Sequence, residues 1–280
     1  MRINIILAAF FAAFLFVAVP DVIGQNAVAH FEQGNANLAA RRFTEAVADY
    51  TRAIQIDPGF VNAYNNRGIA YKRLNQFDKA IEDLTKGISL DPRDPDLFSN
   101  RASVYELQKN YDRAEADYTE AIRLGPNDLK HYYRRGDMRL AREMFTGAIA
   151  DYSKVISMDP SQAAAYLNRG VALIRWGKVI DGFADYRRAI AAYTSLIAKD
   201  PRNVDAYFNR GLTYANLEEY AAAIADFSAA IKLDQSAAAI YFERANAYEA
   251  TMRFMPPAAT AFAIAIPLSR SAARITAIAR

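Results

Sequence analysis

The sequence predicts an all-α protein, an array of stacked antiparallel helix pairs, and three observations support this. A proline recurs every 34 residues, and small residues keep the same step in two further columns. Strand-like alternation of apolar and polar residues is absent. A fixed period of this length is typical of stacked repeats. The columns are Pro58, Pro92, Pro126 and Pro160; Gly34, Gly68, Ala102, Gly136 and Gly170; and Ala46, Ala80, Ala114 and Ala148.

The segment 1–24 precedes the repeats, and its composition indicates a signal peptide. Arg2 supplies a basic start, and an uncharged run of fifteen residues follows from Ile5 to Val19. As a helix this run spans about 22 Å, short of the roughly 30 Å hydrocarbon core of a bilayer. Val22 and Gly24 suit cleavage after Gly24. An uncleaved inner-membrane anchor is the alternative, and either reading predicts an exported, periplasmic or secreted protein.

The residues within one period are specific enough to suggest a family. Position 1 is placed at Val61. The repeat 61–94 then carries Tyr64, Gly68, Tyr71, Ala80, Leu84, Gly87 and Pro92, and the next carries Phe98, Ala102, Tyr105, Ala114, Tyr118, Ala121 and Pro126. This pattern resembles the tetratricopeptide repeat (TPR). The resemblance implies a right-handed α-solenoid, or superhelix, of six to seven repeats, and a protein that binds other proteins.

The array is expected to cover residues 25–250, with repeats starting near 27, 61, 95, 129, 163, 204 and 238. In each repeat, helix A is placed at positions 1 to 14 and helix B at about 17 to 30. Glycine or alanine at position 8 lets the two helices approach closely, and aromatic residues fill the core. Proline at position 32 ends helix B. The first repeat is atypical in its first helix, as expected at an end of an array.

The fifth repeat departs from the period. Its proline comes seven residues late, at Pro201. Seven residues are close to two helical turns, so helix B can lengthen without rotating its apolar face. We expect one helix from about 179 to 199, with two plausible registers. Residues 251–280 are interpreted as a degenerate last repeat and a basic tail, which caps the array, lies in its groove or is loose.

A second periodic pattern joins arginine to aspartate. Position 7 holds arginine in repeats 2 to 7, and position 23 holds aspartate in repeats 1 to 6. We predict that each aspartate pairs with the arginine of the following repeat, because a half-buried guanidinium needs a partner. The arginines are Arg67, Arg101, Arg135, Arg169, Arg210 and Arg244, and the aspartates are Asp49, Asp83, Asp117, Asp151, Asp185 and Asp226.

Composition gives little support for catalysis or for nucleic-acid binding. The 34 basic and 31 acidic side chains nearly cancel, which argues against a nucleic-acid surface. There is no cysteine, and His30 and His131 are far apart without ligand-like spacing, so both are expected at the surface or the edge of the core. No phosphate loop or nucleophile motif is present. We therefore expect a non-enzyme without catalytic residues, cofactor or metal.

The resemblance places the binding site in a groove lined by helices A, at positions 2, 5, 6, 9, 12 and 13. The first half of the predicted groove is polar and basic, and the second half is apolar with asparagines beside it. Asparagine can hydrogen-bond a bound peptide backbone as both donor and acceptor. The predicted groove residues are Asn62, Asn65, Asn66, Arg73, Asn100, Lys130, Arg134, Leu167, Asn168, Val171, Phe208, Asn209, Leu212 and Phe242.

Part of this set resembles the clamp with which some family members hold a terminal carboxylate. Asn100, Lys130 and Arg134 fit it, whereas Asn65 and Ile69 replace its lysine and asparagine. An acidic peptide at Lys130 and Arg134 is one possibility, and neutralisation of these cations by nearby acids is the other. The repeat pattern and the N-terminal segment together predict an exported adaptor that binds a peptide or helix of a cell-envelope protein. The alternatives are a self-associating structural protein and a regulatory subunit of an envelope enzyme. Membrane contact is expected only through the N-terminal segment.

Overall fold

The computed structural model describes residues 26–254, and this part of the chain is built of helices joined by short turns without a strand. A first helix covers residues 26–39. The predicted signal segment and basic tail lie outside the described residues. The helices that follow are α2 Phe43–Ile56, α3 Val61–Arg73, α4 Phe77–Leu90, α5 Pro95–Leu107, α6 Tyr111–Leu124, α7 Leu129–Ala141, α8 Phe145–Met158, α9 Ala163–Arg175, α10 Val179–Lys199, α11 Val204–Asn216, α12 Tyr220–Leu233 and α13 Ala238–Phe254.

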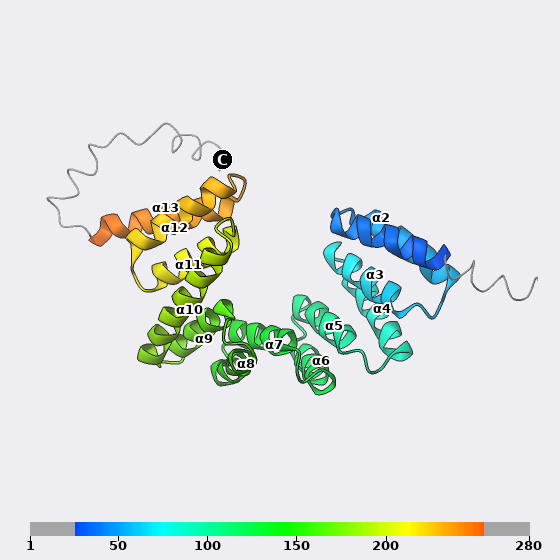
Figure 1. Cartoon of the computed structure of the whole chain (residues 1–280). Helices are drawn as coiled ribbons and strands as arrows, with labels where there is room; N and C mark the ends of the chain where they lie inside the picture. The colour runs from blue at the N-terminus through cyan, green and yellow to red at the C-terminus, as the bar shows by residue number, and fades with distance from the viewer. Residues whose placement is uncertain (1–25, 255–280) are drawn as a thin grey trace, which may run out of the picture. The chain divides into compact units, whose positions relative to one another are not determined.

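Consecutive helices pack as antiparallel pairs, so the predicted all-α solenoid class is confirmed. The described residues divide into two compact units, one ending at Met158 and the other beginning at Asp159. In the first unit α3, α5 and α7 are helices A and neighbour one another, while α2, α4, α6 and α8 are helices B (Figure 1). None of the described helices combines the length and apolar character needed to cross a bilayer.

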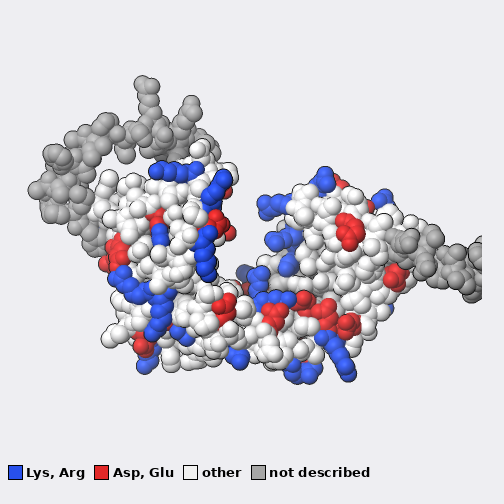
Figure 2. Space-filling model, in the orientation of Figure 1, with Lys and Arg blue, Asp and Glu red and all other residues white. Residues whose placement is uncertain are grey.

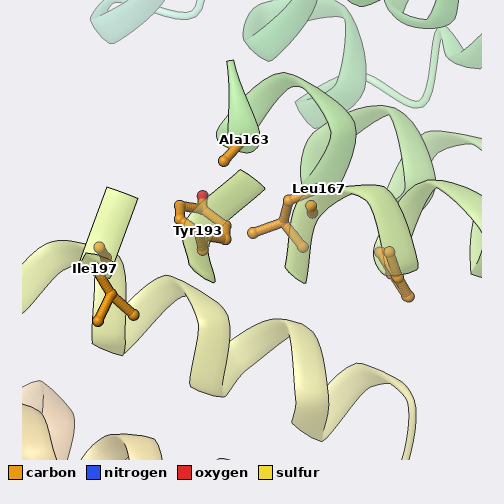
Figure 3. Packing of buried hydrophobic residues seen from close by; sticks show 7 residues of the cluster. Ala163, Leu167, Tyr193 and Ile197 are labelled. Atoms are coloured by element: carbon orange, nitrogen blue, oxygen red, sulfur yellow. The ribbon is translucent and has the colours of Figure 1, made fainter. Parts of the chain in front are cut away.

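The second unit contains α9 to α13, and its core begins between α9 and α10. Ala163 and Leu167 of α9 pack with Tyr193 and Ile197 of α10, and the side chains converge in the close-up of Figure 3. A further cluster joins α11, α12 and α13 around the fully buried Phe227. Each cluster spans more than one helix pair. Burial of apolar surface between neighbouring repeats therefore stabilises the unit, as expected for a solenoid.

Close packing of helices A and B within a repeat depends on the small residue at position 8. A Cβ atom added to Gly136 would lie 2.9 Å from the Tyr152 ring, and one added to Gly170 would lie 2.7 Å from the Tyr186 ring. Helix B therefore fills the space that a larger residue would occupy. The sequence predicts this arrangement, and the structure confirms it.

The turn between helices A and B contains one residue with positive φ in each of the first six repeats. Five of the six are not glycine, although left-handed backbone is unfavourable for residues with a Cβ. Glycine is present only at Gly177, with φ of +89°. The others, all at position 15, are Arg41, Asn75, Lys109, Glu143 and Glu218, with φ near +60°. The two helices can thus reverse direction within a turn of a few residues.

The long helix α10 confirms the prediction that the seven extra residues of repeat 5 extend helix B. It runs from Val179 to Lys199 without interruption. In the first expected register Gly182, Tyr186 and Ala189 are buried, and in the second Ala189 and Tyr193 are buried while Leu196 is partly buried against the same cluster. Tyr186 packs on Gly170 as in the other repeats, while Tyr193 lies one period of seven residues further along the same face.

The predicted pairing between aspartate and the arginine of the next repeat is wrong, because each arginine binds the aspartate of its own repeat. Arg67 donates from Nε and Nη2 to the two carboxylate oxygens of Asp83, both at 2.7 Å. Positions 7 and 23 face each other across the A–B packing of one repeat. The pairs with this bidentate geometry are Arg67–Asp83, Arg101–Asp117, Arg135–Asp151, Arg169–Asp185 and Arg210–Asp226.

The two ends of the pattern differ from these five. Asp49 accepts hydrogen bonds from Asn37 at 2.7 Å and Arg52 at 3.1 Å, since its repeat has no arginine at position 7. Arg244 of the last repeat donates to Ser228 at 3.2 Å. The sequence predicts six Arg–Asp pairs between repeats. The described residues form five, and each lies within one repeat.

The same arginines also reach the preceding repeat, through a hydroxyl group. Arg101 donates from Nη1 to Thr85 Oγ1 at 3.0 Å, and the hydroxyl lies at position 25 of the previous helix B. The hydrogen bond with Asp117 raises the pKa of Arg101 above its ordinary value, so the guanidinium stays charged. The same contact occurs in Arg67–Thr51, Arg135–Thr119 and Arg210–Thr194. A link between repeats thus exists, but its acceptor is neutral.

Candidate partner-binding face

The predicted polar half of the groove lies on neighbouring helices A of the first unit, here called the helix-A face. Asn66 Nδ2 donates to Asn35 Oδ1 at 2.9 Å, and Asn100 Nδ2 donates to Asn65 Oδ1 at 2.8 Å. Each bond joins residues of successive repeats. The structure therefore brings Asn65, Asn66 and Asn100 into one row of amides along the first helix, α3 and α5.

Lys72 lies beside this row and is only partly exposed. Its Nζ donates to Ser103 Oγ at 2.9 Å, and Ser103 donates to the backbone oxygen of Asn100 at 2.6 Å. Burial, together with the positive charges of Arg73 and Arg134, lowers the pKa of Lys72 to about 8. The face therefore concentrates positive charge at α3 and α7.

Acidic groups lie close to these cations. Tyr118 donates from its hydroxyl to Glu106 Oε2 at 3.1 Å, and Tyr152 donates to Asp137 Oδ1 at 2.8 Å. Burial raises the pKa of Glu106, and the charge of Asp137 adds to this shift. The helix-A face is thus a mixture of half-buried cations, carboxylates and amides rather than a uniformly basic surface. Figure 2 also shows basic and acidic side chains intermixed on the visible side of the first unit.

The remaining predicted residues of the first unit differ in how open they are. Asn62, Arg73 and Arg134 are exposed. Lys130 is exposed too, but its Nζ lies 2.5 Å from Asp96 Oδ1 and 3.1 Å from Asp128 Oδ2. The two carboxylates neutralise Lys130, which leaves Arg134 as the more open cation of α7.

The predicted apolar half lies in the second unit, and most of it serves the core. Leu167 is buried, and Val171 packs against the same cluster. Phe208 and Leu212 pack against the cluster around Phe227. The structure therefore gives these four residues a role in stability that the sequence pattern alone does not reveal.

Phe242 differs, because 63% of its surface is exposed on α13. Asn209 Nδ2 donates to the backbone oxygen of Asp205 at 2.9 Å, one turn earlier in α11. Asn168 is half-buried in α9. Phe242 is thus the most open apolar residue of the predicted set.

Several residues of the helix-A face are not among the predicted groove residues. Ser103 and Glu106 occupy positions 9 and 12 of repeat 3, which the family pattern directs into the groove. A single serine or glutamate in a helix is common, so neither stands out until Lys72 and Tyr118 are seen beside them. They become recognisable only through contacts seen in the structure, Lys72 with Ser103 between repeats and Tyr118 with Glu106 within repeat 3.

His131 also differs from its prediction, since it is fully buried rather than at the surface or the edge of the core. It lies in the first turn of α7, next to the carboxylates that hold Lys130. Neither ring nitrogen has a hydrogen-bond partner among the described residues.

Comparison with known proteins agrees with the repeat pattern. Profiles described as tetratricopeptide repeat match residues 61–94, 95–128 and 184–255, and a profile described as TPR repeat matches residues 30–75 and 136–177. Together the matches cover most of the chain. No curated protein sequence matches it.

Three solved structures illustrate the likeness in fold. A tetratricopeptide repeat protein from Parabacteroides merdae is 20% identical with a TM-score of 0.58, covering 81% of this chain and 87% of that one. The MamA protein is 22% identical with a TM-score of 0.54, covering 63% and 96%. A chain of the APC/C hetero-tetramer Cut9–Hcn1 is 15% identical with a TM-score of 0.60, covering 85% of this chain and 45% of that one. At these identities the likeness concerns the fold alone.

Proposed function

The chain belongs to the tetratricopeptide-repeat family, and on that premise we propose that it is a non-enzymatic scaffold that binds a peptide or helix of another protein on its helices A. Repeat arrays of this kind form extended binding surfaces because each repeat adds one more helix to the same face. The partner is a protein segment, and no cofactor takes part.

The observation that carries the proposal is the row of amides on the helix-A face. Asn65 uses its oxygen to accept from Asn100, so its own amide N–H groups remain for a ligand. Asn100 keeps its oxygen as an acceptor in the same way. A peptide backbone alternates donors and acceptors, and fixed amides that present both can hold it with little loss of side-chain entropy.

Charge on this face favours a partner that carries a carboxylate. Arg73 and Arg134 are exposed. Burial lowers the pKa of the neighbouring Lys72 to about 8, and the charges of these two arginines add to the shift. A carboxylate bound here would relieve that repulsion and form charge-assisted hydrogen bonds. We therefore expect acidic segments to bind more tightly than basic ones.

Selection of peptides from a displayed library, followed by affinity measurement on the purified protein, tests the proposal. Arg134→Glu should weaken the selected peptides by at least about tenfold, equivalent to about 1.4 kcal/mol. Lys86→Glu is the matched control, since Lys86 is an exposed lysine on helix B. It should change affinity by less than about twofold. Equal effects of both substitutions, or no enrichment of acidic peptides, would contradict the proposal.

Phe242 provides a separate probe of the second unit. Phe208 is unsuitable, because its ring packs 5.9 Å from that of Phe227 and its removal would disturb the core. Phe242→Ala should weaken a partner that reaches α13, while Ile180→Ala, an 86% exposed residue of α10, should not. A partner unaffected by Phe242→Ala would be restricted to the first unit.

Self-association is a second candidate, and the exposed side chains of α13 favour it. Phe242, Tyr248 and Met252 are each about half or more exposed on this last described helix. Large exposed apolar residues in one region often mark contacts between proteins. Light scattering coupled to size exclusion should then show oligomers that Phe242→Ala disrupts, whereas a wild-type monomer would favour the adaptor. A role as regulatory subunit of an envelope enzyme would require that enzyme to be the captured partner.

We also propose that the protein is exported, on the basis of the basic start and short apolar run of residues 1–24. N-terminal sequencing of the protein isolated from its native cells tests this. A mature chain starting at Gln25 would support a cleaved signal, and a membrane-bound uncleaved chain would support the anchor. A soluble chain that keeps residues 1–24 inside the cell would contradict both.

A further inference from the structure

Three potential metal ligands from two successive repeats lie together at the starts of α5 and α7. They are Asp96 in the first turn of α5, Asp128 immediately before α7, and His131 in the first turn of α7. One ligand atom from each lies within 4.8 Å of the other two. His131 Nε2 lies 3.8 Å from Asp128 Oδ2 and 4.0 Å from Asp96 Oδ1.

His131 is the unusual member of this group. Its side chain is fully buried, and neither ring nitrogen is hydrogen-bonded to another described residue. Buried polar groups almost always have a partner, so an imidazole directed at two carboxylates without a hydrogen bond needs an explanation.

Lys130 shows that the two carboxylates form a cation-binding position. Its Nζ lies between Asp96 Oδ1 and Asp128 Oδ2, at 2.5 and 3.1 Å. The two carboxylate oxygens of Asp128 have different partners. Oδ1 accepts from the backbone N–H of Lys130 at 2.9 Å, and Oδ2 faces the Lys130 ammonium. The Lys130 side chain is 49% exposed, so it can turn into solvent without disturbing the core.

We propose that Asp96, Asp128 and His131 bind a first-row divalent metal ion, with Zn²⁺ the best match, after Lys130 has turned away. One imidazole and two carboxylates are donors that Zn²⁺ accepts, at about 2.0–2.2 Å from the metal. Ligand atoms around such an ion are about 3.3–3.6 Å apart, so Asp96 and Asp128 must move inward by a few tenths of an ångström or more. Both carboxylates are partly exposed and can do so. A fourth position would remain for water.

Two effects limit the affinity of this site. The positive ends of the dipoles of α5 and α7 point toward it, which disfavours a cation. Lys130 competes for the same oxygens. We therefore expect micromolar rather than nanomolar binding. The bound ion would link repeats 3 and 4 at the starts of their helices A, a role separate from partner binding.

Titration of the untagged full-length protein with Zn²⁺, against a coloured competing chelator, tests the proposal. The wild type should bind one equivalent. Lys130→Ala should bind at least about fivefold more tightly because the competing ammonium is gone, and Asp96→Asn at least about tenfold more weakly. Both side chains are nearly half exposed, so neither variant should unfold the protein. Absorption of bound Co²⁺ in the same titration should indicate tetrahedral coordination.

His30 provides the matched control, since it is the other histidine of the chain and lies in the first helix. His30→Gln should leave Zn²⁺ affinity within about twofold of the wild type. The proposal is overturned if the wild type shows no saturable binding below about 1 mM, or if Lys130→Ala fails to tighten binding. It is also overturned if His30→Gln weakens binding as much as Asp96→Asn.

Discussion

In both the regular repeat α5–α6 and the long repeat α9–α10, helix B binds an arginine of its own repeat and an arginine of the next repeat. The number of residues between these two contacts differs. In α6, Asp117 binds the arginine of its own repeat, and Thr119, two residues later, accepts from the arginine of the next repeat. In α10 the corresponding contacts are made by Asp185 and Thr194, which are nine residues apart. The seven extra residues lie between the two contacts. Binding helix A of the same repeat and joining the next repeat are therefore separable functions of helix B.

The two units also differ in what the side chain at position 12 of helix A contacts. In the first unit polar side chains connect neighbouring helices A, as in Asn65–Asn100 and, from position 12, Lys72–Ser103. In the second unit, position 12 of repeat 5 holds Ile174, the counterpart of Lys72, which packs against the apolar core of α9 and α10. Position 12 thus accepts either a cation that bonds to the next repeat or an apolar side chain that packs within its own repeat, while the Arg–Asp pair is the same in repeats 2 to 6.

The largest expected effect follows from removing a carboxylate of that pair in the long repeat. Asp185 is 1% exposed and binds Arg169 through both oxygens, so Asp185→Ala leaves a half-buried guanidinium without its carboxylate. Loss of one member of a buried ion pair costs about 3–5 kcal/mol in the free energy of unfolding. Urea denaturation followed by circular dichroism measures it, and hydrogen exchange should localise the loss to the second unit.

Two controls define this comparison. Asp181→Ala, at an exposed position in the first turn of α10, should cost less than about 0.5 kcal/mol. Asp117→Ala in α6 should cost about as much as Asp185→Ala, because both pairs lie within one repeat. If Asp185→Ala proved as mild as Asp181→Ala, the pair in the long repeat would not have the role it has in the regular one.

Deletion of residues 187–193 would convert the long repeat into a regular one. It places Thr194 directly after Tyr186, so that Asp185 and Thr194 are again two residues apart, as in α6. We expect the protein to remain folded. Loss of the buried Ala189 and Tyr193, and crowding by Leu196 at position 27, should destabilise it by about 2–4 kcal/mol. Circular dichroism and urea denaturation measure both outcomes.

The matched control deletes only residues 187–191, which leaves the rest of α10 rotated by about 140° relative to its apolar face. This shorter deletion should prove more harmful than the longer one. The reverse order would show that α10 does not combine two registers of the same repeat.

The sequence predicts the repeat architecture well because each periodic residue is required by packing within its own repeat. Gly170 and Tyr186 recur in register since one must make room for the other, and the single helix 179–199 follows from a shift of nearly two turns. The partners of the arginines could not be predicted this way. Aspartates occur at position 23 on both sides of Arg101, 18 residues before it and 16 after it, and periodicity alone cannot distinguish them.

The candidate site was less predictable than the fold. Helical period directs Leu167 and Phe242 to the same kind of surface, yet one is buried and the other is exposed, because burial depends on which neighbouring helix covers each position. The group of Asp96 and His131 is a similar case. The two residues are 35 positions apart and meet only because successive repeats stack in register.

The half-buried Lys72 of the first unit should make the stability of the protein depend on pH. Its pKa in the folded protein is about 8, below the ordinary 10.5, so the folded state releases this proton at lower pH than the unfolded chain does. Between these values the unfolded state binds more protons, and stability should rise with pH by about 1–2 kcal/mol. Lys72→Met should be more stable at pH 7 and should lose this rise. Urea denaturation at pH 7, 8 and 9.5 measures it.

Lys86→Met is the control for this pH dependence, because Lys86 is exposed on α4 and should leave the profile of the wild type unchanged. If the wild type shows no rise above pH 8, or if Lys86→Met abolishes it as well, the half-buried ammonium of the helix-A face does not limit stability.

The smallest expected effect separates two buried tyrosines, Tyr152 at position 24 of repeat 4 and Tyr193, which lies seven residues beyond position 24 of repeat 5. Tyr152 donates from its hydroxyl to Asp137 at 2.8 Å, so Tyr152→Phe should cost about 1 kcal/mol. The Tyr193 hydroxyl is buried without a partner among the described residues, so Tyr193→Phe should be neutral or stabilising by up to about 1 kcal/mol. Paired urea denaturation curves measure the difference. Repeat 6 already carries a fully buried phenylalanine, Phe227, at position 24, where repeat 4 has Tyr152. A loss of about 1 kcal/mol for Tyr193→Phe as well would mean that the inserted turns supply their own polar partner, and that α10 is more than a second copy of the apolar face.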